Sequence, residues 1–284
     1  MLDITMDRPV EHRETHSYVE ASLTYCVDTG EKPVIYPSEA GGRSERRVGQ
    51  YADHAVAIHN GRSHVEPLSL DREGFLLTEH ETRVQDFYDE EEVRTVYESE
   101  IEQLIKELSG ATKVVVFDHT RRADAAATRD QKLMREPARM VHSDYTQRSA
   151  PQRIRDLLPA PEAEQRLKGR FAIINIWRPM RDPVQTVPLA VCDARTIAEG
   201  DLVVTERRAR DRIGEIYQIA FNPDHRWYYF PYMQRNEALV FKCFDSAVDG
   251  RARFAPHTAF DDPTSPPGAP ARESIESRTI AFFQ

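Results

Sequence analysis

The feature of this sequence that most constrains its fold is a series of short apolar runs in its C-terminal part, separated by turn residues. Seven such runs lie at 171–177, 189–192, 202–205, 215–221, 227–230, 238–244 and 277–283. Runs of this length with turns between them are typical of β-sandwiches and barrels, not of alternating strands and helices. With earlier strand candidates about eight strands are available, which suits a double-sheet jelly roll. We therefore predict a mainly β protein with a double-stranded β-helix (jelly-roll, cupin-like) core and flanking helices.

The N-terminal part supplies the remaining strand candidates. Leu23, Tyr25 and Val27 alternate with polar residues, which predicts extended structure within 21–38. Residues 39–66 are rich in Gly, Arg, Ser and His and predict a long loop.

Two amphipathic helices are expected outside the β core. The first spans 89–109, where apolar residues recur on one face, with Asp89 as its N-cap and Gly110 at its end. A short β-branched run at 113–117 predicts a core strand directly after it. A second helix is predicted over 151–167.

Size and charge favour one acidic domain. The chain has 284 residues, and a β barrel of this length commonly forms a single domain, so we expect an N-terminal arm at 1–20 and one domain over 21–284. The net charge of −9 argues against general nucleic-acid binding, which needs a basic face. A homodimer is compatible with the sequence, although no apolar stripe argues for one.

The sequence shows no pattern typical of a membrane span, a secretory signal or a paired-cysteine motif. No apolar run approaches the roughly 20 residues that span a bilayer, and the N-terminus lacks the pattern of a secretory signal. The three cysteines, Cys26, Cys192 and Cys243, are far apart and form no CxxC. We therefore expect a cytoplasmic protein with reduced thiols and no membrane partner.

The sharpest local motif is His142-Ser143-Asp144. In an extended segment residues i and i+2 point to the same side, so one imidazole and one carboxylate project together. With a second histidine they would form the two-histidine, one-carboxylate set that suits Fe(II) and leaves coordination positions open. Two open positions can take the keto-acid end of 2-oxoglutarate, and the third can take O₂.

The candidate for the second histidine is His257, which follows a predicted core strand and precedes the final strand. Spacing alone leaves an alternative open, in which His142 and Asp144 form a surface hydrogen-bonded pair and His257 is a loop residue. An Arg-x-Ser pattern, Arg272 and Ser274, opens the last strand and favours the metal interpretation. A fixed guanidinium and a hydroxyl on one face of a strand suit the distal carboxylate of 2-oxoglutarate, with Arg278 as a second candidate anchor.

Several blocks in the same order resemble a fungal and bacterial family of secondary metabolism. They are Val115-Val-Phe-Asp-His-Thr120, His142-Ser-Asp-Tyr-Thr146, Asn175-Ile-Trp-Arg-Pro179, Pro188-Leu-Ala-Val-Cys-Asp193, Phe241-Lys-Cys-Phe-Asp-Ser246, Pro256-His-Thr-Ala-Phe260 and Ala271-Arg-Glu-Ser-Ile-Glu276. The family contains the cephem 7α-hydroxylase component of cephamycin biosynthesis, a gibberellin desaturase and a meroterpenoid endoperoxide synthase. The resemblance covers roughly residues 20–284. Members are often labelled methyltransferases, but this sequence has no Gly-rich strand-to-helix loop for S-adenosylmethionine.

The resemblance implies a double-stranded β-helix that uses Fe(II), 2-oxoglutarate and O₂ to hydroxylate or desaturate a C–H bond of a small secondary metabolite. By position it assigns metal ligation to His142, Asp144 and His257, and the 2-oxoglutarate anchor to Arg272. It leaves the substrate and the oxidative outcome open.

Four further residues are candidates for contacts inside the cavity. Tyr229 could donate to a carboxylate of 2-oxoglutarate, and Tyr145, Trp177 and Arg178 could contact substrate. For both tyrosines, packing in the core is the alternative, and Arg178 could equally tie down a loop.

Two other classes of function remain open. The chain could be a metal-dependent cupin-type enzyme that does not use 2-oxoglutarate, or a non-catalytic partner subunit of a tailoring methyltransferase. Formation of succinate from 2-oxoglutarate would separate a 2-oxoglutarate-dependent oxygenase from both of these alternatives.

Overall fold

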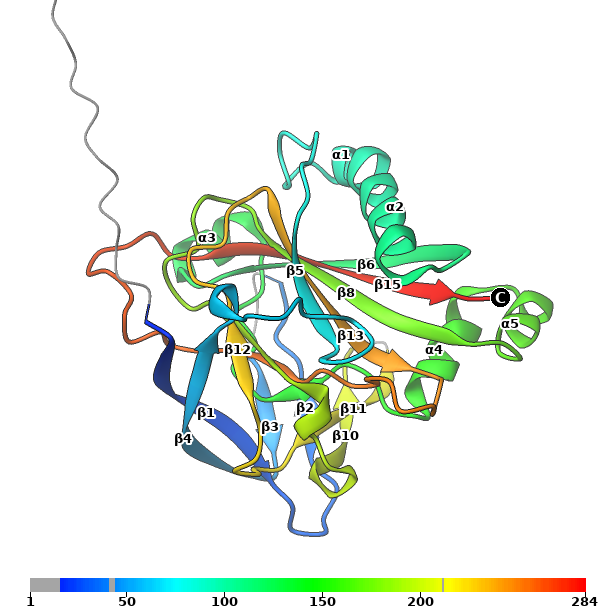
Figure 1. The fold of residues 1–284 in the computed structure, drawn as a ribbon, viewed down its shortest axis with the longest axis horizontal. Coiled ribbons are helices and arrows are strands. Elements are labelled where there is room, and N and C mark those ends of the chain that lie inside the picture. The colour runs from blue at the N-terminus through cyan, green and yellow to red at the C-terminus, as the bar shows by residue number, and fades with distance from the viewer. Residues whose placement is uncertain (1–15, 41–43, 211) are drawn as a thin grey trace, which may run out of the picture.

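The computed structural model describes residues 16–40, 44–210 and 212–284, which form two β-sheets connected by loops and helices (Figure 1). The larger sheet has the strand order β1 (Tyr18–Val27), β4 (Gln50–Asn60), β12 (Trp227–Tyr229), β9 (Leu189–Cys192), β14 (His257–Ala259), β7 (His142–Ser143), β11 (Ile213–Ile219), β10 (Leu202–Arg208), β2 (Val34–Tyr36) and β3 (Arg46–Val48). The smaller sheet has the order β5 (Phe75–Glu79), β13 (Glu237–Asp245), β8 (Phe171–Pro179), β15 (Glu273–Phe282) and β6 (Lys113–Ala123). The predicted mainly β class with a jelly-roll core is confirmed.

The helices and helical turns connect these strands. They are η1 (Gly61–Ser63), α1 (Glu90–Glu92), η2 (Val93–Tyr97, a π-helical turn), α2 (Glu98–Ser109), α3 (Ala126–Lys132), α4 (Ser149–Leu157), α5 (Ala160–Arg166), η3 (Ala194–Thr196) and η4 (Glu199–Asp201). In the described part of the chain, no helix is long and apolar enough to cross a membrane.

Strand β8 shows how the layers are built, because its two faces belong to different cores. Ile173 and Trp177 lie in the core between the two sheets, together with residues of β9, β12 and β13. Ile174 and Ile176 lie in a second core, between the smaller sheet and the helix α2. A strand buried on both faces must be apolar along its length, which explains the continuous run that marked it in the sequence.

The helix predicted over 89–109 is confirmed as the continuous segment α1, η2 and α2. The Asp89 side chain accepts hydrogen bonds from the backbone N–H groups of Glu91 and Glu92, as an N-cap does. Gly110 ends the helix in the left-handed region with φ +73°. This helix covers the outer face of the smaller sheet (Figure 1).

The single helix predicted over 151–167 is wrong, because the chain forms two helices, α4 and α5. Leu158, between them, has extended backbone angles (φ −110°, ψ 153°). The ring of Pro159 disfavours a helical conformation at the preceding residue, so the break lies where the sequence contains this proline.

The long loop predicted over 39–66 is also wrong. The strand β4 pairs with β1 in continuous antiparallel register, from Tyr18 opposite His59 to Val27 opposite Gln50. Most of β4 is only partly covered, and its alanine and histidine residues gave it no apolar alternation. Its strand conformation therefore depends on pairing with β1 and not on its own composition.

At the N-terminus, the predicted arm falls mostly on residues 1–15, which lie outside the described residues. Its last three residues, from Tyr18, already belong to β1. Cys26, Cys192 and Cys243 are buried free thiols.

Candidate metal centre

Two neighbouring strands bring the predicted ligands together. His257 on β14 lies directly opposite His142 on β7 in an antiparallel pair, and their ring centroids are 4.4 Å apart. Asp144 follows β7, and its Oδ1 lies 3.6 Å from Nε2 of His142. One potential ligand atom from each of the three residues lies within 4.8 Å of the other two. The three residue positions predicted from the sequence therefore converge on one point.

The hydrogen bonds of the two histidines leave Nε2 free to bind a metal. Nδ1 of His142 lies 2.7 Å from the carbonyl oxygen of Met140, and Nδ1 of His257 lies 3.3 Å from that of Ala255. Since a carbonyl oxygen only accepts, these contacts assign the proton to Nδ1 and a lone pair to Nε2. Among the described residues Nε2 of buried His257 has no hydrogen-bond partner. A divalent cation at this point would satisfy that atom, so the residues fit a metal.

The electrostatics favour the protonation states that metal ligands need. Burial lowers the pKa of both His142 and His257 to about 4, so both imidazoles are neutral at pH 7. Burial alone would raise the pKa of Asp144, but the Arg278 guanidinium beside it holds that pKa well below its ordinary value. The cluster thus combines two neutral imidazoles with one carboxylate, the donor set of the Fe(II) facial triad.

The second carboxylate oxygen of Asp144 is held by Asn175 and Arg278. Oδ2 accepts hydrogen bonds from Nδ2 of Asn175 at 2.9 Å and from Nε of Arg278 at 2.8 Å, which directs Oδ1 toward the histidines. Arg278 also pairs with Asp118 at 2.6 Å and Glu276 at 2.5 Å. Three carboxylates therefore surround Arg278, and its guanidinium holds Asp144 in place.

The role of Asn175 was missed from the sequence, although a signal was present. It is the one polar residue in the apolar run 171–177, and a buried amide in such a run needs a partner. Asn175→Leu should weaken Fe(II) binding by about 10- to 100-fold, the usual cost of losing an outer-shell partner of a metal ligand. Anaerobic calorimetric titration with Fe(II) measures this affinity.

A matched control lies on the other face of the same sheet. The Thr279 hydroxyl donates to the carbonyl oxygen of Ile174 at 2.8 Å and is fully buried. Thr279→Val should therefore cost stability and leave iron affinity unchanged. Equal iron affinity in Asn175→Leu and the wild type would show that Asn175 does not support the metal ligand.

Arg272 and Ser274 lie inside the barrel with unsatisfied polar atoms. Nη1 of Arg272 donates to the carbonyl oxygen of Val187 at 2.6 Å, and its guanidinium lies 5.5 Å from the ring centroid of Trp177. In the described chain, Nε of Arg272 and Oγ of Ser274 are buried without a partner. Burial lowers the pKa of Arg272 to about 9. A buried cation beside a free hydroxyl fits an incoming carboxylate.

The remaining predicted contacts are distributed around the barrel. Tyr145 is buried and lines the cavity next to Asp144. Trp177 lies against Arg272, and Tyr229 packs edge-on against Phe260 at a centroid distance of 5.5 Å.

Arg178 requires a correction, since the structure does not bring it to the cavity. Because strand residues alternate, it lies on the opposite face of β8 from Asn175 and Trp177. There it contacts the ring and carbonyl of His80, the carbonyl oxygen of Arg235 and the ring of Tyr97. These contacts connect β8 to neighbouring segments beneath α2, in line with the alternative that Arg178 ties down a loop.

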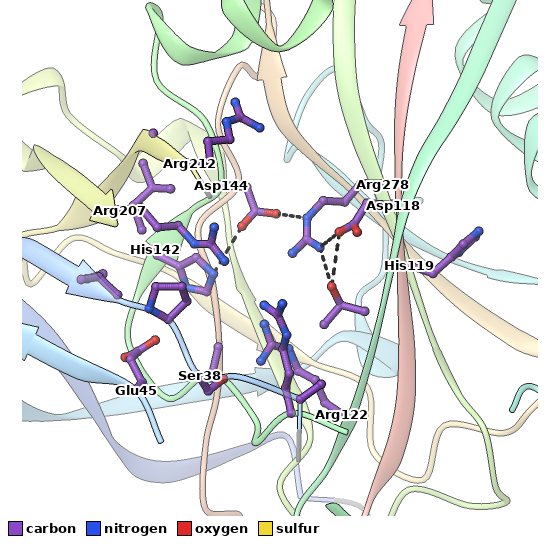
Figure 2. A pocket seen from close by; sticks show the side chains of 18 of the residues that line it. Ser38, Glu45, Asp118, His119, Arg122, His142, Asp144, Arg207, Arg212 and Arg278 are labelled. Atoms are coloured by element: carbon purple, nitrogen blue, oxygen red, sulfur yellow. Dashed lines mark hydrogen bonds and ion pairs between the residues drawn. The ribbon is translucent and has the colours of Figure 1, made fainter. Parts of the chain in front are cut away.

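A cavity of about 590 Å³ opens in front of His142 and Asp144. Figure 2 shows Asp144 and Arg278 at its inner end, with Arg122 and Arg207 directed into it from opposite sides. Cavities of this size accept small organic molecules.

Comparisons with known proteins agree with this fold and site. The family described as "Oxidoreductase/YMDC permease-like domain" matches residues 23–282. The "Hydroxylase/desaturase efuI" of Hormonema carpetanum is 36% identical over 275 residues, which cover 86% of this chain and 91% of that protein. The "Fe(II)/2-oxoglutarate-dependent dioxygenase nvfI" of Aspergillus novofumigatus is 32% identical over 279 residues, which cover 94% of this chain and 98% of that protein.

A solved structure, titled "iron and alpha-ketoglutarate-dependent endoperoxidase NvfI", superposes with a TM-score of 0.84 at 28% identity, over 94% of this chain and 98% of that one. The coverage of both chains shows that the fold is shared over nearly their whole length. Together with the matches along nearly the whole sequence, it shows that the chain belongs to this family of Fe(II)- and 2-oxoglutarate-dependent oxygenases.

Proposed function

We propose that His142, Asp144 and His257 bind Fe(II) in this chain, and that Arg272 and Ser274 bind the distal carboxylate of 2-oxoglutarate. The enzyme then hydroxylates or desaturates a C–H bond of a small secondary metabolite. The observation that carries the proposal is the buried Nε2 of His257, which has no partner in the described chain and faces His142 and Asp144.

The protein residues divide the work by position. When bound, Fe(II) with 2-oxoglutarate and O₂ supplies the oxidising power for an unactivated C–H bond, with 2-oxoglutarate converted to succinate and CO₂. His142, Asp144 and His257 would hold the ion with three protein ligands, and a ligand set of this kind leaves coordination positions for the co-substrate. Asn175 and Arg278 fix the orientation of Asp144.

The walls of the site limit access of water. The ring of Phe241 lies 4.5 Å from that of His257 and is fully buried. Tyr145 closes the side next to Asp144, where burial raises the pKa of its hydroxyl so that it stays protonated. A dry wall of this kind strengthens the charge interactions that orient the bound groups.

The proposal extends to the organisation and location of the chain. Residues 21–284 act as one oxygenase domain on a small molecule in the cytoplasm, without a nucleic-acid or membrane partner. The buried free thiols and the net charge of −9 support this part of the proposal.

Succinate formation tests the function. Purified protein supplied with Fe(II), 2-oxoglutarate and O₂ should form succinate, slowly without substrate, and the rate should fall to background in Asp144→Ala. If iron binds but no succinate forms under any condition, a metal enzyme that does not use 2-oxoglutarate replaces this proposal.

A further inference from the structure

The cavity in front of the metal centre has a cationic wall, made of Arg122, Arg135, Arg153 and Arg207. In the same order, these residues come from β6, from the segment before β7, from α4 and from β10. Arg122 and Arg207 direct their guanidinium groups toward the space between His142 and Asp144 (Figure 2). Four cations from separate parts of the sequence therefore meet in one cavity.

Within 16–40, 44–210 and 212–284, none of these four guanidinium groups forms an ion pair. Nη1 of Arg122 donates to the carbonyl oxygen of Glu136 at 2.6 Å, and Nε of Arg153 is buried without a partner. Arg153 lies over the ring of Phe117, 4.7 Å from its centroid. The cationic wall thus has unused hydrogen-bond donors directed at the cavity or buried beside it.

The acidic residues of the same cavity do not compensate this charge, because five carboxylates line it against eight Lys and Arg side chains. The carboxylates also form ion pairs, although Asp118 and Asp144 share one arginine. The pairs are Glu45 with Arg47 at 2.8 Å, Glu90 with Arg121 at 2.5 Å, Asp118 with Arg278 at 2.6 Å, Asp144 with Arg278 at 2.8 Å and Glu215 with Lys32 at 2.6 Å. The excess positive charge of the cavity therefore comes from the cationic wall.

This arrangement is unfavourable without a ligand. Burial lowers the pKa of Arg122 and of Arg207, and repulsion by Arg278 and Arg135 acts in the same direction, whereas Glu276 near Arg122 and Asp144 near both arginines oppose it. Half-buried guanidinium groups that converge in one cavity without ion pairs repel one another, and an anion between them would relieve this repulsion. A carboxylate between them would accept two parallel hydrogen bonds from either fork.

Apolar residues form part of the remaining lining and indicate a carbon skeleton, alongside polar residues such as Ser38, Thr120 and Ser149. Ile35, Phe117, Met140 and Ile216 contribute to the wall around the arginines. A cavity of about 590 Å³ with a cationic wall, and with both apolar and polar surfaces elsewhere, suits a carbon skeleton that carries an acid group.

We propose that the primary substrate is an organic acid, a carbon skeleton with a carboxylate held by the cationic wall, which places one of its C–H bonds before the metal centre. This inference rests on the proposed function and names the class of its substrate. Arg122 lies opposite Ser274 in the pairing of β6 with β15. Because Ser274 is proposed to bind 2-oxoglutarate, a separate experiment must test whether Arg122 binds 2-oxoglutarate and not the substrate.

The test uses the anaerobic complex of the protein with Fe(II) and 2-oxoglutarate and two matched probes, 4-phenylbutanoate and 4-phenylbutanamide. They differ in charge at one end and little in size. Calorimetric titration should show the acid binding at least about tenfold more tightly than the amide, which corresponds to about 1.4 kcal/mol. The preference should shrink as ionic strength rises.

Two variants and a control connect this preference to the cationic wall. Arg207→Gln alone should reduce the preference, and Arg122→Leu with Arg207→Leu should remove it, while exposed Arg94→Leu keeps it. Circular dichroism measures whether each variant is folded. If the double leucine variant does not fold, the comparison is made with Arg207→Gln alone. Equal binding of acid and amide, no binding of either, or a preference that survives in the folded variants would overturn the inference.

A second titration separates the substrate from the co-substrate. The visible charge-transfer band of the Fe(II)–2-oxoglutarate complex reports 2-oxoglutarate affinity in the same variants. Loss of this affinity in parallel with loss of the acid preference would assign the arginines to 2-oxoglutarate and overturn the inference, leaving the proposed function intact. Absence of the band in the wild-type protein would contradict the proposed function instead.

Discussion

His257→Ala should abolish Fe(II) binding and succinate formation while the barrel stays folded. Nε2 of His257 has no hydrogen bond to lose in the described chain, and its Nδ1 makes only a long one, 3.3 Å, to Ala255. The metal, however, loses one of three protein ligands, so its affinity should fall by more than the roughly 100-fold that an outer-shell loss costs. Anaerobic titration with Fe(II) measures the affinity, and thermal unfolding measures the fold.

His225 provides the control for this variant. It is a buried histidine of the same protein, but its Nε2 bonds to Asp201 at 3.0 Å and it lies outside the cluster. His225→Ala should lower stability and leave iron affinity unchanged. Wild-type iron affinity in His257→Ala would remove His257 from the ligand set.

Arg272→Leu should raise the Kd for 2-oxoglutarate about 30-fold or more, since loss of one partner of a buried charge pair costs roughly 2 kcal/mol or more. Iron affinity without 2-oxoglutarate should not change, because Arg272 does not contact His142, Asp144 or His257. Titration of the charge-transfer band measures the Kd.

The thermal stability of Arg272→Leu is a second measurement, independent of its affinity for 2-oxoglutarate. The folded-state pKa of Arg272 lies below its ordinary value, so at neutral pH the buried cation costs folding free energy when no carboxylate is bound. Arg272→Leu should therefore leave the melting temperature of the ligand-free protein unchanged or raised. Exposed Arg181→Leu is the control for the affinity. A marked loss of ligand-free stability, with 2-oxoglutarate affinity intact, would make Arg272 a structural residue.

Much of the metal centre could be predicted because its geometry depends on local rules. His142 and Asp144 are two residues apart in an extended segment, so their convergence follows from strand geometry alone. The position of His257 was predicted from its place before the last strand. The direct pairing of His257 with His142 depends on the register of β14 with β7, which no local pattern encodes.

The differences between expectation and structure have two physical origins, strand alternation and tertiary pairing. Arg178 was considered for substrate contact together with Trp177, although neighbouring residues on a strand face opposite sides. Arg278 remained a second candidate anchor for 2-oxoglutarate, and its sequence neighbours do not reveal that Asp118, Asp144 and Glu276 surround it. The strand β4 was missed because β1, and not its own composition, makes it a strand.

Anaerobic titration of the purified protein with Fe(II) and then 2-oxoglutarate tests the central claim most directly. The account predicts a visible charge-transfer band that saturates with one 2-oxoglutarate per iron, that is absent in His257→Ala and that needs much more 2-oxoglutarate in Arg272→Leu. Iron binding without the band, or a band that His257→Ala leaves intact, would contradict it.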